Sequence, residues 1–132
     1  QWFKLYNEIG LDNVYVTVDT GTFYTTIKPK MPVYDAILKL GKHINCVHVK
    51  DEVGFTNIIQ CQHVWLGAGF VDFKEVARAL KEIDYQGYCA VEWEGWQNGG
   101  LAGVGDPGGI GLSDFDMVAS ESKLFLEEEG FC

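Results

Sequence analysis

The sequence predicts an α/β fold built on a parallel sheet. Three short runs rich in β-branched and aromatic residues lie at about 14–19, 44–50 and 88–94, and stretches with helical spacing of apolar residues separate and follow them. A chain that alternates strand and helix in this way lays its strands side by side in parallel, with right-handed crossovers. We therefore treat residues 1–132 as a single domain organised around three strands.

Helices are expected before, between and after these strands. Residues 1–9, 33–41 and 73–83 each place apolar side chains on one helical face. Asp72 stands in front of the third of these helices as a candidate N-cap, with a glutamate three residues further on, as in a capping box. Ser113 is the expected cap of a last helix. The helices between the strands would supply the crossovers of the sheet.

The composition favours a globular protein and argues against several partners. The chain carries 10 Lys and Arg against 19 Asp and Glu, which gives a net charge of −9. Nucleic-acid binding needs clustered basic residues, so we expect no nucleic-acid partner. No apolar run approaches the roughly 20 residues of a membrane helix, and the cysteines show neither CxxC nor metal-finger spacing. We therefore expect a reduced, cytoplasmic protein without a membrane partner.

Three polar residues stand at the carboxyl ends of the predicted strands: Asp19, His48 and Glu92. Side chains alternate across a strand, so His48 and Lys50 share a face and the neighbouring valines take the other. In a barrel, residues at the ends of adjacent strands converge. An aspartate, a glutamate and a histidine form a mixed oxygen and nitrogen ligand set, which suits Mn²⁺, Mg²⁺ or Co²⁺. The alternative is that they are ordinary strand-end residues that meet solvent or cap a helix.

Four segments carry a resemblance through their order and spacing. They are Val-Asp-Thr-Gly-Thr (18–22), His-Val-Lys-Asp (48–51), Leu-Gly-Ala-Gly-Phe-Val-Asp-Phe (66–73) and Tyr-Cys-Ala-Val-Glu-Trp-Glu (88–94). Together they resemble the C-terminal half of the sugar phosphate isomerase/epimerase superfamily of xylose-isomerase-like TIM barrels. The resemblance implies a partial (β/α)8 barrel, in which residues 1–132 form one partial-barrel domain with strands six to eight and their helices.

The resemblance also implies roles for individual residues. Asp19, His48 and Glu92 would hold a divalent metal, and Glu92 would be the catalytic acid or base. His63 falls where relatives bind substrate or metal, and we expect it to bind substrate. The reaction implied is isomerisation or epimerisation of a sugar or cyclitol, by proton abstraction next to a metal-bound carbonyl. Independently of the resemblance, Lys50 is expected to bind substrate through a positive charge at the rim, or merely to reach water.

Two departures from the family pattern bear on this assignment. Many relatives have a histidine where this chain has Thr22, which weakens the endonuclease and standard ketose-epimerase assignments. The family's fourth ligand, a glutamate that ends strand five, would lie before residue 1, and a complete barrel takes ~250 residues. We therefore expect a fragment, or one partner in an association with the missing half-barrel or another protein chain. Enzyme activity is expected only where the barrel is complete.

Two other functions stay open from the sequence. A keto-polyol dehydratase begins with the same proton abstraction, and a catalytically silent half-barrel, as a fragment or interaction subunit, would keep three ligands without the fourth. Trp65, Trp93 and Trp96 are candidates for an apolar sugar platform, with core packing the alternative for Trp93. The glycine-rich stretch 99–111 lacks the Lys-Ser/Thr of a P-loop, so we expect a cover or connection there rather than a phosphate site.

Overall fold

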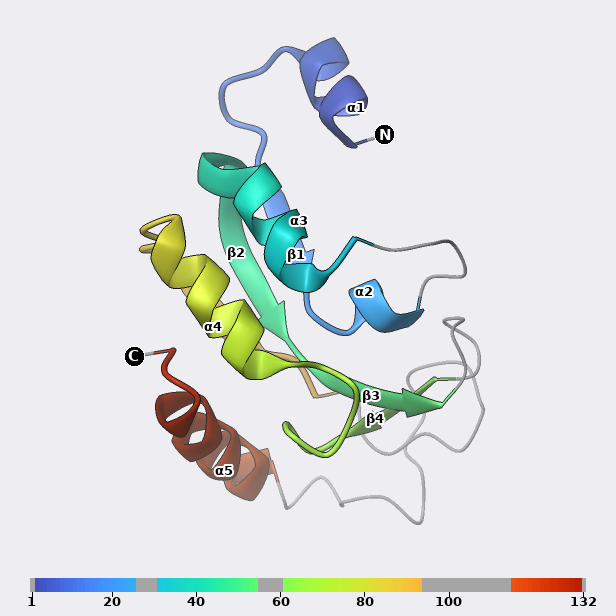
Figure 1. The fold of residues 1–132 in the computed structure, drawn as a ribbon, viewed down its shortest axis with the longest axis vertical. Helices are drawn as coiled ribbons and strands as arrows, with labels where there is room; N and C mark the ends of the chain where they lie inside the picture. Colours follow the sequence, from blue (N-terminus) through green and yellow to red (C-terminus); the bar gives the residue numbers. More distant parts are fainter. Residues whose placement is uncertain (1, 26–30, 55–60, 94–114, 132) are drawn as a thin grey trace.

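The computed structural model describes residues 2–25, 31–54, 61–93 and 115–131 (Figure 1). They form an α/β fold with a parallel sheet, as the alternation of strands and helices predicted. In chain order the elements are α1 (Trp2–Ile9), β1 (Val16–Asp19), α2 (Thr22–Thr25), α3 (Val33–Leu40), the 3-10 turn η1 (Gly41–His43), β2 (Ile44–Val49), β3 (Asp51–Gly54), β4 (Cys61–Val64), α4 (Phe73–Glu82), β5 (Tyr88–Val91) and α5 (Phe115–Glu128).

The parallel sheet has β2 at its centre, between β1 and β5. Its register aligns Asp19 of β1 with His48 of β2, and His48 with Ala90 of β5. Because all three strands run in the same direction, their carboxyl ends meet at one edge of the sheet. The candidate ligands predicted at the strand ends are therefore brought to the same edge.

The strands are shorter than the sequence predicted. β1 begins at Val16 rather than 14, β2 ends at Val49 rather than 50, and β5 ends at Val91 rather than 94. At the end of β2 the reason is a competing side chain: the backbone N–H of Lys50 donates to the hydroxyl of Thr20, 3.0 Å away, in place of a strand partner.

One face of the sheet is apolar and carries the core. Val47 and Val49 of β2 have no exposed surface, and they belong to one cluster with Ile37 of α3 and Val76 of α4. Figure 1 shows α3 and α4 side by side over this face. Burying an aliphatic side chain of this size stabilises the fold by about 1.5–3 kcal/mol, so the valines of β2 are a main source of stability.

The start of α4 is capped as predicted. The Asp72 carboxylate accepts a hydrogen bond from the backbone N–H of Glu75 at 3.1 Å. The exposed polar face and the buried apolar face of α4 follow the expected helical spacing. The expected cap of the last helix, Ser113, and the stretch 99–111 lie outside the described residues.

An antiparallel hairpin follows the central strand, in a segment outside the three strands that the sequence predicted. β3 and β4 pair so that Glu52 lies opposite His63. The residues of β3, Asp-Glu-Val-Gly, have low intrinsic strand propensity, so the pairing was not visible in the local sequence. In Figure 1 the hairpin extends beyond the carboxyl end of β2, next to the edge that carries the candidate ligands.

β5 is the most exposed of the three parallel strands. Val91 is 38% exposed and lies outside the core cluster, and Tyr88 is 84% exposed. Within the described part of the sheet, β2 is the only strand that pairs with β5.

Among the helices the structure describes, none combines the length and the apolar character needed to cross a membrane.

Candidate metal centre

The structure brings Asp19, His48 and Glu92 together at the edge of the sheet. Each residue offers one ligand atom, and the three atoms lie within 4.8 Å of one another. The Nδ1 atom of His48 is 2.7 Å from an oxygen of Glu92. Glu92 follows β5 directly, and its backbone N–H donates to the carbonyl of Val49 at 3.0 Å, which holds it beside the end of β2. The three groups are half-buried, on the face opposite the core valines.

Lys50 lies deeper in this cluster than the sequence predicted. Its ammonium is 3.0 Å from Asp19, 3.2 Å from Glu92 and 3.8 Å from Glu52, and its side chain is 11% exposed. Burial lowers the pKa of Lys50, but the hydrogen bonds and charges of Asp19 and Glu92 outweigh it and hold the pKa above its ordinary value. Lys50 is therefore a fixed positive charge inside the site.

The charge of the cluster suits a divalent cation. Asp19, Glu52 and Glu92 contribute three carboxylates around the single ammonium of Lys50, which leaves a charge of −2 when the histidines are neutral. The donor atoms are carboxylate oxygens and an imidazole nitrogen, which fit hard cations such as Mn²⁺ or Mg²⁺. The described residues thus fit a divalent metal by charge and by donor type.

The hairpin contributes two buried polar residues, Glu52 and His63, each 4% exposed. The Nε2 atom of His63 lies 3.8 Å from a carboxylate oxygen of Glu52. Burial lowers the pKa of His63, and the charge of Lys50 lowers it further, against smaller opposing effects of Glu92 and Asp19. His63 is therefore neutral near pH 7. Sequence reasoning missed Glu52, although the alternation that places His48 and Lys50 on one face reaches Glu52 two residues later.

The segment after β1 holds Lys50 in place. The hydroxyl of Thr20 donates to the carbonyl of Lys50 at 2.6 Å and accepts from its N–H. A Cβ at Gly21 would lie 2.8 Å from the carboxylate of Glu52 and 3.0 Å from Cγ of Lys50, so a residue with a side chain would displace both. The Asp-Thr-Gly motif after β1 therefore supplies a ligand, a clamp and the space for two charged side chains.

Asp51 is a buried anchor that sequence reasoning also missed. Its carboxylate, 1% exposed, accepts hydrogen bonds from the backbone N–H groups of Glu52, Gly67, Gly69 and Val71 at 2.8–3.1 Å. Burial raises the pKa of Asp51, and these four bonds oppose that rise by favouring the charged form. A Cβ at Gly69 would lie 2.2 Å from the carboxylate, so glycine is required there. The anchor fixes the loop after β4 against the end of β2.

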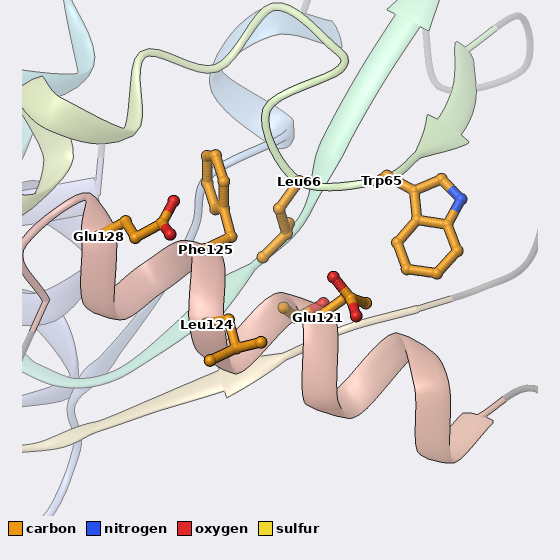
Figure 2. A pocket seen from close by; sticks show the side chains of 7 residues that line it. Trp65, Leu66, Glu121, Leu124, Phe125 and Glu128 are labelled. Carbon is orange, nitrogen blue, oxygen red and sulfur yellow. The ribbon is translucent and has the colours of Figure 1, made fainter.

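Two of the three tryptophans considered for a sugar platform lie together. The rings of Trp65 and Trp93 are both half-buried and pack against each other, with centroids 5.8 Å apart. Trp96 lies outside the described residues. Trp65 also lines a separate cavity of about 300 Å³ between the loop after β4 and α5, with Leu66 and Phe125 (Figure 2). None of the candidate metal ligands lines that cavity.

Comparisons with known proteins place this fold in a family. The sequence profile of the xylose isomerase-like TIM barrel family matches residues 1–107. An uncharacterized protein of Methanocaldococcus jannaschii is 30% identical over 89 residues, which cover 67% of this chain and 29% of that protein. This chain therefore spans less than a third of the length of that relative.

Two solved structures share the fold. A D-allulose 3-epimerase from Methylomonas sp. matches with a TM-score of 0.60 and 20% identity, over 97% of this chain and 41% of that chain. An L-ribulose 3-epimerase matches with a TM-score of 0.60 and 16% identity, over 98% and 40%. The described fold is thus an α/β fold with a parallel sheet that matches part of a TIM barrel of sugar epimerases. The chain belongs to the xylose isomerase-like TIM barrel family.

Proposed function

We propose that this chain supplies three metal ligands to a divalent-metal-dependent isomerase or epimerase that acts on a sugar or cyclitol. The observation that carries the proposal is the approach of the Asp19, His48 and Glu92 ligand atoms to within 4.8 Å of one another. Membership of the family, and the sugar 3-epimerases among the structures that share its fold, support the substrate class. In this proposal the three parallel strands are strands six to eight of the barrel, and the remaining ligand comes from strand five.

Glu92 is the proposed acid or base. A bound Mn²⁺, Mg²⁺ or Co²⁺ would supply positive charge that polarises the carbonyl of the substrate. Glu92 would take the proton from the neighbouring carbon. The C–H electron pair would form a double bond to the carbonyl carbon while the C=O π pair moves onto the carbonyl oxygen. An epimerase then returns a proton to the opposite face of the same carbon, whereas an isomerase returns it to the other carbon. Before a metal binds, His48 and Lys50 each contact one oxygen of the Glu92 carboxylate and fix its orientation.

His63 and Lys50 are the proposed substrate contacts. A neutral imidazole can donate to one hydroxyl of a polyol or accept from it, which suits a histidine whose pKa is lowered by burial. From its position beside Glu52, the ammonium of Lys50 would stabilise negative charge that develops on the substrate oxygen. Both groups lie beside Glu52, so its carboxylate would orient them without touching the substrate.

A catalytically silent half-barrel is the second candidate, and one observation favours it. Lys50 already places a positive charge between Asp19 and Glu92, two of the three candidate ligands. An ammonium at that position can replace the structural part of a metal's role. In that case the chain would serve as an interaction subunit or as part of a larger protein.

The proposed function is tested by exchange of a substrate proton with solvent. The protein is incubated with Mn²⁺ in D₂O with D-allulose or L-ribulose, and deuterium at the carbon next to the carbonyl is followed by NMR. We expect incorporation when this chain is combined with the half-barrel that supplies strands one to five, and none when the chain carries Glu92→Gln, because an amide cannot accept the proton. Glu8→Gln, an exposed change on α1, is the matched control and should exchange normally.

Either of two results would count against the proposal. Appreciable exchange by a folded Glu92→Gln variant would remove Glu92 from its role. A wild-type protein that neither exchanges the proton nor binds Mn²⁺ would favour the silent half-barrel. Circular dichroism of each variant establishes that the fold is intact.

A further inference from the structure

The candidate metal centre contains its own cation. The ammonium of Lys50 is within hydrogen-bond distance of one oxygen of Asp19, at 3.0 Å, and one oxygen of Glu92, at 3.2 Å. These two carboxylates are also two of the three groups that approach closely enough to hold a metal ion. The ammonium and a divalent metal ion would therefore compete for the same two carboxylates, and the two positive charges would repel each other.

The backbone of Lys50 is fixed, so its side chain cannot leave the site by a shift of the chain. Thr20 binds both the carbonyl and the N–H of Lys50. The stem of the side chain passes close to Gly21, where a Cβ would come within 3.0 Å of Cγ. Any movement of the ammonium must therefore come from rotation about its terminal side-chain bonds.

Glu52 offers the ammonium a second position. Its carboxylate oxygen is 3.8 Å from the Lys50 nitrogen, and its side chain is 5% exposed. A small rotation toward Glu52 would keep Lys50 beside a carboxylate and release Asp19 and Glu92. The structure therefore holds a lysine between two ligands on one side and a non-ligand carboxylate on the other.

We propose that Lys50 is an internal competitor for the divalent cation: it holds Asp19 and Glu92 together in the metal-free protein and moves to Glu52 when a metal binds. This inference rests on the metal site of the proposed function. It predicts a site that stays assembled without metal, and a metal affinity that is weaker than the three ligands alone would give.

Titration of the full chain with Mn²⁺ by calorimetry tests the competition. Lys50→Met removes the charge and keeps a side chain of similar length, and we expect Mn²⁺ to bind at least about tenfold more tightly than to the wild-type protein. Lys50→Arg keeps the charge and should bind as weakly as the wild-type protein. Lys74→Met removes an exposed charge from α4 and controls for the change in net charge.

The outcomes separate this inference from the proposed function. If the wild-type protein binds Mn²⁺ and Lys50→Met binds it equally or more weakly, the competition is overturned and the metal site stands. If neither protein binds Mn²⁺, both proposals fail. If Lys50→Met alone binds, the competition is supported in its strongest form.

Thermal unfolding gives a second readout, because Lys50→Met leaves buried carboxylates without their ammonium. The metal-free variant should melt below the wild-type protein, and saturating Mn²⁺ should raise its Tm by more than it raises the wild-type Tm. A variant that stays unfolded at every Mn²⁺ concentration would overturn the inference, since a divalent cation should then replace the missing ammonium.

Discussion

Two of the three strands that carry the candidate site, β2 and β5, differ sharply in how they are held. β2 leads through His48 to the site and lies between two other strands, with Val47 and Val49 fully buried. β5, which leads to Glu92, is an outer strand of the described sheet, and its Tyr88 is 84% exposed. The two strands pair in parallel. Val47 and Val49 of β2 are part of the core cluster, whereas β5 contacts that cluster through the partly buried Cys89.

The difference separates the stability of the fold from the geometry of the site. The end of β2 is fixed by the buried Asp51 anchor and by the clamp of Thr20 on Lys50. Glu92 at the end of β5 depends on its bond to the Val49 carbonyl and on contacts with His48 and Lys50. Substitutions in β2 should therefore mainly lower the free energy of unfolding, and substitutions in β5 should mainly change the position of Glu92.

The largest expected effect comes from the anchor of the β2 side. Asp51→Asn replaces one oxygen that accepts backbone N–H bonds with an NH₂ group, which faces those donors and cannot accept from them. We expect the free energy of unfolding to fall by about 3 kcal/mol, measured by urea denaturation. Asp72→Asn is the matched control, because asparagine caps a helix as well as aspartate does. An Asp51→Asn variant as stable as the wild-type protein would show that the anchor does not hold the loop.

Matched valine truncations test the comparison directly. Val47→Ala opens a cavity in the core and should cost about 2 kcal/mol, whereas Val91→Ala, already 38% exposed, should cost under about 0.5 kcal/mol. The same denaturation experiment measures both variants. Equal losses would mean that β5 is packed in solution as tightly as β2, and the contrast between the two strands would be wrong.

The smallest expected effect is a dependence of protein stability on pH, caused by Tyr85 next to β5. The Tyr85 hydroxyl donates to the carbonyl of Tyr88 at 2.8 Å, and burial raises the pKa of Tyr85 to about 12, with smaller contributions from Cys89 and Cys46. Since the pKa is higher in the folded protein than the ordinary value of 10.0, the stabilisation is complete below pH 10 and is lost as the pH rises towards 12. Between pH 10 and pH 12, the Tm should decrease less steeply with pH for Tyr85→Phe than for the wild-type protein. Identical slopes would exclude Tyr85 as the cause.

Patterns within short stretches of sequence, such as strand alternation and helix capping, predicted part of the fold correctly. The alternation around His48 placed the valines of β2 in the core, and the spacing of Asp72 and Glu75 marked the start of α4. The strand ends also located Asp19 and Glu92 at one edge, because parallel strands share their direction. The first two depend on residues a few positions apart, and the third depends on the order of strands and helices along the chain.

The rest depends on pairings between segments far apart in the sequence. Asp51 accepts hydrogen bonds from Gly67, Gly69 and Val71, which reach it only after the hairpin forms. The burial of Lys50 requires Asp19 and Glu92 from two other strands, so its own neighbours in sequence suggested an exposed rim. Val91 is 38% exposed and stays outside the core cluster, whereas Val18 of the other outer strand is buried, so the alternation of a strand does not by itself show which valines the helices cover.

The register of the sheet has a consequence for how this family can diversify. Asp19 and His48 are paired by the backbone ladder, whose spacing of about 4.8 Å between neighbouring strands does not depend on side-chain identity. A change of residue type at these tips therefore alters the hardness and charge offered to a cation and leaves the frame unchanged. If the proposed metal site is correct, single substitutions at these tips would change which cation the site prefers and would leave the scaffold unchanged.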